Sequence, residues 1–530
     1  MRKIIIGSRG SELALWQAEF VKEELRKLKV ETEIKIIKTQ GDEIQHLSFD
    51  KMEGKGFFTK EIESALLAKD IDLAVHSHKD LETSSPEGLR IAAVSYREDP
   101  RDVLLVRPEA LNKSRFLNIK ENAVVGTSSA RRKSQLLNFD PSITIKDLRG
   151  NVPTRIGKLL DGNYDAIVIA AAGLERIQAD TGNLMRFPLS PQVFIPAPAQ
   201  GVLGLQIRED DAFLTEKLQH LNDSEVEEVI GVERAILKSL NGGCQIPFGA
   251  YCEKTGAQYQ LWTSIGEVAD SSPTGGNEKL KRFYIAGKDA KDIQEQAIKA
   301  VKESVNDKKI LITRDEEENN YIFRYLKSIG ANVTGKSFIR IKPMRFSSNL
   351  MTDWVFFSSK NAVKHFFDQQ PQFKKKVRFG VIGSGTEQAL IETGHSPSFV
   401  GKGVDTQQDG KAFQEELSNG DTVLFPQSKN SIRTIQKQLE FTAKVIDLYV
   451  YDTEIIEESD TIEADVVVFT SPSNVEGYFK SHRPDNEKTY IAIGKTTGKA
   501  LELHQIKDYV VAWETSPLAL CDAITKEVLC

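Results

Sequence analysis

Cys244 lies in a stretch that favours a loop and presents a thiol at its edge. Residues Leu240 to Gly249 read Leu-Asn-Gly-Gly-Cys-Gln-Ile-Pro-Phe-Gly. Glycine and proline at these positions cannot continue a helix, so we predict an irregular loop. Apolar residues at helical spacing predict a helix from Glu227 to Leu240, directly before that loop. Taken alone, the local pattern is also typical of a small buried cysteine.

A carboxylate, Asp80, follows a predicted strand that begins at Ile71 and ends in polar residues. Ligands bind at the carboxyl ends of strands in open α/β sheets. A carboxylate in such a place can accept N–H donors, stabilise a cation or shuttle a proton. His76 and His78 have the chemistry of metal ligands, but the sequence around them offers no further ligand cluster. We therefore expect no metal here.

Six arginines share one topological position, because each follows a predicted strand or begins a predicted helix. They are Arg9, Arg131, Arg132, Arg149, Arg155 and Arg176. Each one alone is typical of a solvated surface arginine, whereas in a parallel sheet these positions share one edge. Guanidinium groups pair well with carboxylates and phosphates. The set therefore predicts a ligand with several carboxylates or phosphates.

The elements that must position these side chains alternate between strands and helices. Strands are predicted over residues 3–6, 33–39, 71–75, 143–148 and 164–171, with helices over 12–27 and 60–69. A Gly/Ser loop between the first strand and the first helix can aim backbone N–H groups at an anion. The same layout is also typical of a plain turn between a strand and a helix. A glycine-flanked loop from Glu53 to Lys60 lacks the spacing of a phosphate-binding loop and suggests a mobile lid or a solvated loop.

Length and composition exclude several classes of protein. At 530 residues the chain is long enough for several domains. Its net charge of −6 argues against a protein whose partner is nucleic acid or a membrane surface. We expect no signal peptide and no membrane span. Four cysteines form no disulfide framework or zinc signature and fit a reducing cytoplasm.

The second half contains an internal repeat. Residues 353–367 align with 465–479, and residues 381–390 align with 492–501, at a nearly constant offset. Each copy reads as strand, Ser/Thr loop and helix, followed by strand, Gly-Thr loop and helix. Hydroxyls at helix starts are often simple N-caps. Two copies facing each other would also line a cleft with hydroxyls and N–H groups, which suits carboxylates.

The first half resembles hydroxymethylbilane synthase, also called porphobilinogen deaminase. The motifs stand in family order across roughly residues 1–305. They are Gly7–Ala18, Gly54–Gly56, Val75–Leu81, Arg97–Asp102, Gly126–Ser129, Leu148–Asn151 and Gly242–Gln245. The resemblance implies an α/β multidomain fold. Two domains like those of periplasmic binding proteins, residues 1–98 with 195–220 and residues 99–194, would face each other across a cleft, and a small α/β domain over 221–305 would carry the cysteine.

The resemblance also implies the chemistry. Cys244 would hold a dipyrromethane cofactor through a thioether, which the protein makes from its own substrate, porphobilinogen. Asp80 would be the catalytic carboxylate that assists ammonia loss and stabilises the cationic azafulvene. Two residues depart from the family pattern. Family members usually carry an apolar residue where His78 stands and a proline where Glu82 stands. We interpret both departures as changes in local packing and charge that bear on the pH optimum.

The same resemblance assigns binding residues. The cofactor would be held by Cys244, Lys79, Ser77, Thr127, Ser128, Ser129, Arg131 and Arg132. The substrate would be held by Arg9, Ser11, Lys55, Phe58, Arg149, Arg155, Arg176 and Gln200. The arginines would bind acetate and propionate side chains by charge-assisted hydrogen bonds.

Beyond a linker predicted at Asn306 to Lys309, the second half resembles uroporphyrinogen-III synthase over about residues 308–530. The motifs are the Phe-Ser/Thr-Ser strands of the repeat, Val423–Pro426, Val450–Thr453 and Ile493–Thr497. The likeness implies two domains joined by two strands, residues 308–343 with 453–530 and residues 344–452. The reaction would close hydroxymethylbilane with inversion of its last ring, without metal or cofactor. Tyr451 would assist loss of the hydroxyl, beside Ser358, Ser471, Thr496 and Thr497.

The sequence therefore predicts a bifunctional enzyme of tetrapyrrole synthesis. It would be a cytoplasmic monomer that acts on small molecules and binds neither nucleic acid nor membrane. Two alternatives stay open. One is a deaminase whose second half is a degenerate structural copy. The other is a two-lobed carboxylate-binding protein, which would have no use for a modified thiol.

Overall fold

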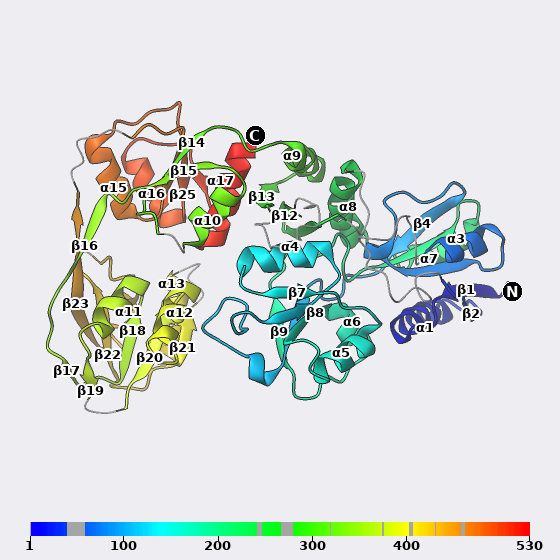
Figure 1. Cartoon of the computed structure of the whole chain (residues 1–530), viewed down its shortest axis with the longest axis horizontal. Helices are drawn as coiled ribbons and strands as arrows, with labels where there is room; N and C mark the ends of the chain where they lie inside the picture. Colours follow the sequence, from blue (N-terminus) through cyan, green and yellow to red (C-terminus); the bar gives the residue numbers. More distant parts are fainter. Residues whose placement is uncertain are drawn as a thin grey trace. The chain divides into compact units, whose positions relative to one another are not determined.

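The chain folds into two compact units. A computed structural model describes residues 2–39, 59–240, 246–266, 279–317, 320–373, 376–401, 406–429, 431–456 and 462–529. The first unit holds residues 1–305 and 529–530, and the second holds residues 306–528 (Figure 1). The division falls next to Asn306, where the predicted linker starts. Both units are built from sheets covered by helices, and no described helix is long and apolar enough to cross a membrane.

The first sheet of unit 1 has the strand order β2-β1-β3-β10-β4. Its strands are β1 (Ile4–Ser8), β2 (Thr32–Ile36), β3 (Leu73–Ser77), β4 (Leu89–Val94) and β10 (Leu203–Arg208). Its helices are α1 (Glu12–Lys27), α3 (Lys60–Leu67) and α7 (Ala212–Gln219). β1 is parallel to β2 and β3, whereas β10 is antiparallel to β3 and β4. A short 3-10 turn, η2 (His78–Asp80), directly follows β3.

The second sheet of unit 1 has the equivalent order β7-β6-β8-β5-β9. Its strands are β5 (Asp102–Val106), β6 (Val124–Gly126), β7 (Thr144–Lys146), β8 (Ala166–Ala170) and β9 (Met185–Leu189). Its helices are α4 (Ala130–Phe139), α5 (Val152–Leu160) and α6 (Ala171–Arg176). The chain crosses from the first sheet to the second at β5 and returns to the first at β10. Each of these two strands runs antiparallel to its neighbours. The sheets are therefore mixed, but the strands that precede the six arginines, β1, β6, β7 and β8, pair in parallel within their own sheets.

The third part of unit 1 is a three-stranded antiparallel sheet packed against two helices. It consists of β11 (Phe248–Thr255), β12 (Gln258–Gly266), β13 (Leu280–Gly287), α8 (Ser224–Ser239) and α9 (Ala290–Lys302). Alternate β11 side chains point into a core with the apolar stripes of the two helices. Helix α9 begins after Asp289, which caps it, and ends before Glu303, which has extended backbone.

The first sheet of unit 2 is entirely parallel, in the order β15-β14-β24-β25-β26. Its strands are β14 (Lys309–Ile312), β15 (Asn332–Gly335), β24 (Val466–Phe469), β25 (Thr489–Ala492) and β26 (Val510–Val511). Its helices are α10 (Tyr321–Ser328), α15 (Pro472–Ser481), α16 (Lys495–Leu503) and α17 (Pro517–Leu529).

The second sheet of unit 2 has the order β16-β23-β22-β18-β20-β21 and is parallel except for β16. Its strands are β16 (Ile339–Pro343), β18 (Trp354–Phe357), β20 (Arg378–Ile382), β21 (Phe399–Gly401), β22 (Thr422–Ser428) and β23 (Lys444–Ile455). Its helices are α11 (Lys360–Phe367), α12 (Ser384–Glu392), α13 (Thr406–Glu415) and α14 (Thr434–Leu439). A two-stranded ribbon, β17 (Asn349–Leu350) with β19 (Gln372–Phe373), stands apart.

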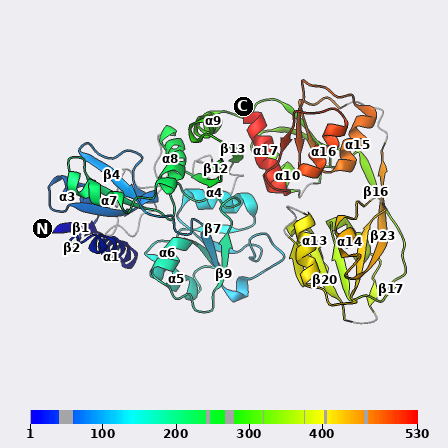
Figure 2. The same ribbon diagram turned by 180° about the vertical axis from the view of Figure 1, so that it is seen from behind.

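Helices cover both faces of this second sheet. Trp354 and Phe356 pack with Phe413 of α13, while Val355 and Phe357 pack with Phe366 of α11. Figure 1 shows α11 and α12 in front of the strands, and Figure 2, from behind, shows α13 and α14. A strand buried on both faces must be apolar at every position, which explains the uninterrupted Trp-Val-Phe-Phe run.

The predicted repeat is present in the fold. The order β18, α11, β20, α12 recurs as β24, α15, β25, α16. Ser359 and Ser471 occupy the same place in the two copies, and each hydroxyl accepts a hydrogen bond from a backbone N–H in the first turn of the next helix. At these two positions the hydroxyl is therefore an N-cap.

We expect Gly201→Ala to destabilise unit 1, because Gly201 has a φ of +92° and an added Cβ would collide with the carbonyl oxygen of Glu98. The loss of unfolding free energy should be roughly 1–3 kcal/mol. Gly231→Ala, inside α8 with open space around the position, is the matched control and should stabilise by about 0.5–1 kcal/mol. Chemical denaturation of the two variants measures both changes, and a loss of the same size in each would contradict the argument.

Candidate active site

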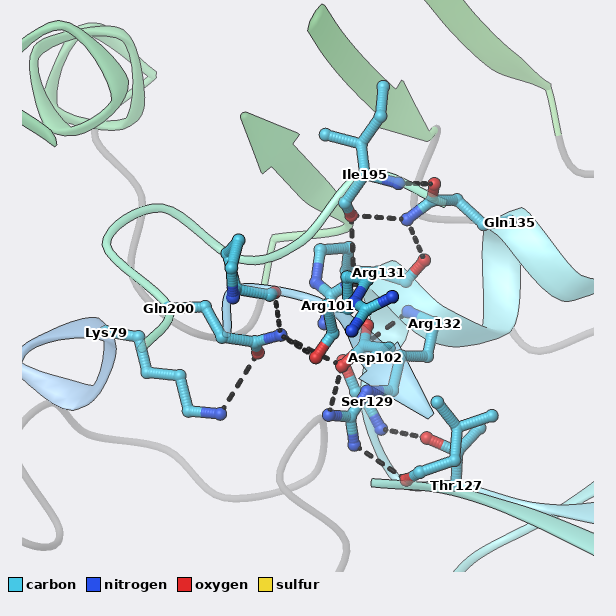
Figure 3. A network of polar contacts seen from close by, with 12 residues as sticks. Lys79, Arg101, Asp102, Thr127, Ser129, Arg131, Arg132, Gln135, Ile195 and Gln200 are labelled. Atoms are coloured by element: carbon cyan, nitrogen blue, oxygen red, sulfur yellow. Dashed lines mark hydrogen bonds and ion pairs between the residues drawn. The ribbon is translucent and has the colours of Figure 1, made fainter. Parts of the chain in front are cut away.

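The centre of the site is a buried carboxylate. Asp102, the first residue of β5, is fully buried and pairs with two arginines from the first turn of α4 (Figure 3). Arg131 Nη1 lies 2.9 Å from Asp102 Oδ2, and Arg132 Nη2 lies 2.7 Å from Asp102 Oδ1. Burial alone would raise the pKa of Asp102, but the two guanidinium charges outweigh it and hold this pKa well below its usual range.

The same arginines tie neighbouring backbone to the carboxylate. Arg131 Nη1 also donates to the Ile195 carbonyl oxygen at 2.8 Å, and Arg132 Nη1 donates to that of Val168 at 2.9 Å. Gln135 donates to the Ile195 carbonyl oxygen as well and accepts from its N–H. The Arg132 Nε atom is buried and has no hydrogen-bond partner among the described residues, so it is a donor available to a ligand.

Gln200 links this network to the first sheet. Its Nε2 donates to Asp102 Oδ1 at 3.1 Å and to the Pro100 carbonyl oxygen at 2.8 Å. Its Oε1 accepts from Lys79 Nζ, in the η2 turn, at 3.1 Å (Figure 3). Burial lowers the pKa of Lys79 to about 8, with the charges of Asp80 and Asp102 acting in the opposite direction. One chain of polar contacts therefore joins the ends of β3 and β5.

Asp80 stands exposed at the end of η2, among cations from both sheets. Its charge favours the protonated forms of Lys79 and Arg155. Burial, together with the charges of Arg132 and Arg149, lowers the pKa of Arg155 to about 10. The structure therefore brings together one exposed carboxylate and several cations, which is an arrangement that can hold a ligand with several carboxylates and oppose one positive charge on it.

The unusual histidine near Asp80 acts through packing. The ring of His78 is buried against Gly204, and a Cβ added to that glycine would come within 3.2 Å of it. Burial lowers the pKa of His78 to about 3 and that of His76 to about 4, and His76 Nε2 lies 3.1 Å from Gln206 Oε1. Both rings are neutral near pH 7, so His78 adds no charge beside Asp80 there. No group of three or more potential metal ligands occurs in the described ranges.

The predicted hydroxyl ligands have local structural partners. Ser11 and Ser129 cap α1 and α4. Ser77 accepts from Gln17 Nε2 at 2.9 Å, Thr127 accepts from the Ser129 N–H at 3.2 Å, and Ser128 bonds both the N–H and the carbonyl oxygen of Leu148 at 3.0 Å. Their roles toward a cofactor or substrate stay predictions.

The remaining predicted residues of the first half are dispersed. Arg176 lies at the crossover between the sheets, where it donates to the Gly201 carbonyl oxygen at 2.7 Å and its guanidinium lies 5.6 Å from the Trp16 ring centre. Arg9 is half-buried directly after β1. Three predicted residues lie outside the described residues; they are Lys55, Phe58 and Cys244.

In unit 2, Tyr451 is buried and its hydroxyl lies 3.4 Å from Ser359 Oγ. Burial raises the pKa of Tyr451. Ser358, the residue before that cap, is exposed, and so is Thr496, whereas Thr497 is buried. The structure thus pairs Tyr451 with Ser359 rather than showing a contact with the predicted Ser358.

Sequence reasoning missed two cations in unit 2. Arg314 closely follows β14, and Lys360 is the first residue of α11. Burial lowers the pKa of Lys360, and the charge of Arg314 lowers it further, while Glu317 opposes both. The two cations are therefore close enough to repel each other, near the Ser359 cap. The rule applied to the first half, a cation just after a strand, would have found Arg314.

Sequence reasoning also gave Asp102 no role. The signal was present, because a charged residue opens a strand whose other residues are all apolar and buried. A charge at such a position needs a buried partner.

The fold and this site define a class of protein: mixed α/β lobes that present clustered cations and one carboxylate to an anionic ligand. Comparison with family models identifies the family. "Porphobilinogen deaminase, dipyromethane cofactor binding domain" matches residues 4–216, and "Porphobilinogen deaminase, C-terminal domain" matches 228–303. "Uroporphyrinogen-III synthase HemD" matches 325–522. The chain belongs to the porphobilinogen deaminase family, and its residues 325–522 match the model of uroporphyrinogen-III synthase.

Curated relatives agree with the first assignment. The chain is 44% identical over 269 residues to a porphobilinogen deaminase of Oceanobacillus iheyensis, which covers 50% of this chain and 85% of that protein. It is 39% identical over 322 residues to one of Bacillus mycoides, which covers 60% of this chain and 100% of that protein. A solved uroporphyrinogen-III synthetase of Helicobacter pylori is 16% identical with a TM-score of 0.31, covering 40% of this chain and 96% of that one.

Asp102→Asn leaves two buried guanidinium charges without their counter-charge, so we expect the unfolding free energy to fall by about 3–5 kcal/mol. Asp99→Asn is the matched control, because it removes the partner of Arg101, whose side chain is 43% exposed, and should cost at most about 1 kcal/mol. Chemical denaturation at pH 7 measures both losses. If Asp102→Asn cost no more than Asp99→Asn, Asp102 would not be the centre of the network.

Proposed function

We propose that this chain is a bifunctional enzyme of haem biosynthesis. Its first half would condense four porphobilinogen molecules into hydroxymethylbilane, with release of four ammonia molecules and uptake of one water. Its second half would close that product to uroporphyrinogen III, with inversion of the last ring and loss of its hydroxyl as water. The observation that carries the proposal is the group of cations around Asp80 in a chain that matches both families.

We propose that a dipyrromethane is attached to Cys244 through a thioether. The residues present fit such a group, because Lys79, Arg132 and Arg155 offer positive charge to its carboxylates and the buried Arg132 Nε is a donor without a partner among the described residues. The family model over residues 4–216 is that of the cofactor-binding domain. When bound, the dipyrromethane supplies the free pyrrole position at which chain growth starts.

Asp80 is the proposed catalytic carboxylate. Loss of ammonia leaves positive charge on the substrate, and an ionised carboxylate that accepts the pyrrole N–H stabilises that charge. The charge of Asp80 interacts with the charges of Lys79 and Arg155, so the carboxylate stands beside two cations. The same cations would pull the acetate and propionate groups to one side, so that the substrate's pyrrole faces Asp80.

Lys79 and the arginines are the proposed binding groups. With a pKa lowered to about 8, Lys79 is largely protonated at pH 7 and can pair with a carboxylate. Arg131 and Arg132 are held by Asp102, so their side chains lose little freedom when a ligand binds. Arg9, Ser11, Lys55, Phe58, Arg149, Arg155, Arg176 and Gln200 remain the proposed substrate contacts, and Gln200 also holds Lys79.

In the second half, we propose that Tyr451 assists departure of the hydroxyl, with Ser359 as its neighbour. Arg314 and Lys360 are suited to the carboxylates of the linear tetrapyrrole, since Arg314 lies in the loop after β14 and Lys360 begins α11. The proposed domains are residues 308–343 with 453–530 and residues 344–452. The proposed state is a monomer in the cytoplasm.

The intact mass of the purified chain tests the first activity. From cells that make porphobilinogen, we expect extra mass equal to two linked pyrrole units, because Cys244 would carry the dipyrromethane. Cys244→Ser should lack this mass, while Cys252→Ser, which changes a buried cysteine in β11, should retain it. An unmodified wild-type chain would refute the attachment and favour a carboxylate-binding protein.

The isomer of the product tests the second activity. Starting from porphobilinogen, the whole chain should yield mainly the type III isomer, because unassisted closure gives type I. Tyr451→Phe should shift the product toward type I without slowing porphobilinogen consumption, whereas Tyr449→Phe, at an exposed position of the same strand, should not. Type I alone from the wild-type chain would indicate a second half that is structural only.

A further inference from the structure

One arginine of the third part of unit 1 holds the turn that carries Asp80. Arg234 lies within α8, and its guanidinium reaches η2 and the residues after it. Arg234 Nη1 donates to the His78 carbonyl oxygen at 3.2 Å. Arg234 Nη2 donates to the carbonyl oxygens of Leu81, at 3.3 Å, and Glu82. The planar guanidinium group thus donates hydrogen bonds to the backbone on both sides of Asp80.

The turn needs such a support because it is short. Within it, the Leu81 N–H donates to the His78 carbonyl oxygen at 3.2 Å, a single i to i+3 bond. On the side of β10, the His78 N–H donates to the Val202 carbonyl oxygen at 2.9 Å. Beyond Asp80, the backbone carbonyl oxygens of Leu81 and Glu82 accept hydrogen bonds from Arg234. Removing its guanidinium would leave those two carbonyl oxygens without this donor.

The neighbouring residue on α8 anchors the same turn of helix to the crossovers between the sheets. Glu233 is fully buried and accepts two hydrogen bonds from Arg97, at 2.7 and 3.3 Å. It also accepts the N–H of Ala199 at 2.7 Å and that of Cys252 at 2.8 Å. Because these contacts of Glu233 fix this part of α8, the backbone that carries Arg234 is held in place.

We propose that Arg234 is a positioning residue for the deaminase reaction: it fixes the Asp80 turn so that the carboxylate keeps its place beside the cations of the site. This inference rests on the proposed function of Asp80. Asp80 is exposed, and both Lys79 and Arg155 attract it, so an unsupported turn would let the carboxylate collapse onto either cation. A displacement of about 1 Å at a catalytic group can cost roughly 100-fold in rate.

The test compares Arg234→Met and Arg234→Lys with a matched control. Arg208→Met also removes a buried arginine of unit 1 that donates to backbone carbonyl oxygens, those of Leu66 and Ile71, but on another turn. Three quantities are measured on the full chain: kcat and KM for porphobilinogen, the midpoint of thermal unfolding, and amide hydrogen exchange of residues 78–82 without substrate.

We expect Arg234→Met to lower kcat by roughly 10- to 100-fold with little change in KM, and to speed exchange of the 78–82 amides. Arg234→Lys should recover part of kcat, because an ammonium can reach one carbonyl oxygen but lacks the planar fork. Arg208→Met should lower the unfolding midpoint and leave kcat and exchange of 78–82 unchanged.

Unchanged kcat in Arg234→Met would overturn the proposal, and so would a loss of kcat that Arg208→Met shows equally. Unchanged exchange of residues 78–82 would also overturn it, whatever happens to the rate. A wild-type chain without deaminase activity would instead refute the proposed function, while the exchange measurement would still report on the Arg234 contact.

Discussion

A buried negative charge governs the first unit. Asp102 is removed from water, and a lone carboxylate in that position would be strongly destabilising. Arg131 and Arg132 satisfy it, and each also donates to one backbone carbonyl oxygen, that of Ile195 or that of Val168. The ion pair thereby joins a strand, a helix and a crossover segment. Gln200 donates to this carboxylate and accepts from Lys79, so both side chains are placed relative to Asp102.

The network also explains how an acidic chain presents a basic site. The net charge is −6, yet the described surroundings of Asp80 are rich in cations. Several of these cations are partly withdrawn from water, so their field at the site is less screened than that of surface lysines. Local burial, not overall charge, decides which ligand is attracted. For the proposed reaction, the cations would bind carboxylates and Asp80 would face the only positive charge that forms.

The two units place polar groups at strand ends by different features of the fold. Unit 1 inserts one antiparallel strand into each sheet, which carries Asp102 to the junction at the start of β5. Unit 2 repeats a strand and helix module, so Ser359 and Ser471 cap equivalent helices. In unit 2 the cations come from single positions, Arg314 and Lys360, that the repeat does not duplicate. This asymmetry fits a site that must distinguish the two ends of a linear substrate.

Sequence alone determined the local elements and the residue types. The strand before Arg9, the helix from Glu12 to Lys27 and the duplicated modules follow from hydrophobic period and caps, which are properties of neighbouring residues. Motifs were enough to single out Asp80 and Cys244. Tertiary structure decided which arginines meet: it collected Arg132, Arg149 and Arg155, set Arg176 at a crossover, and gave Asp102 its partners. The reason is that strand direction and long-range pairing are not encoded locally, and a buried charge takes whatever partner the fold brings to it.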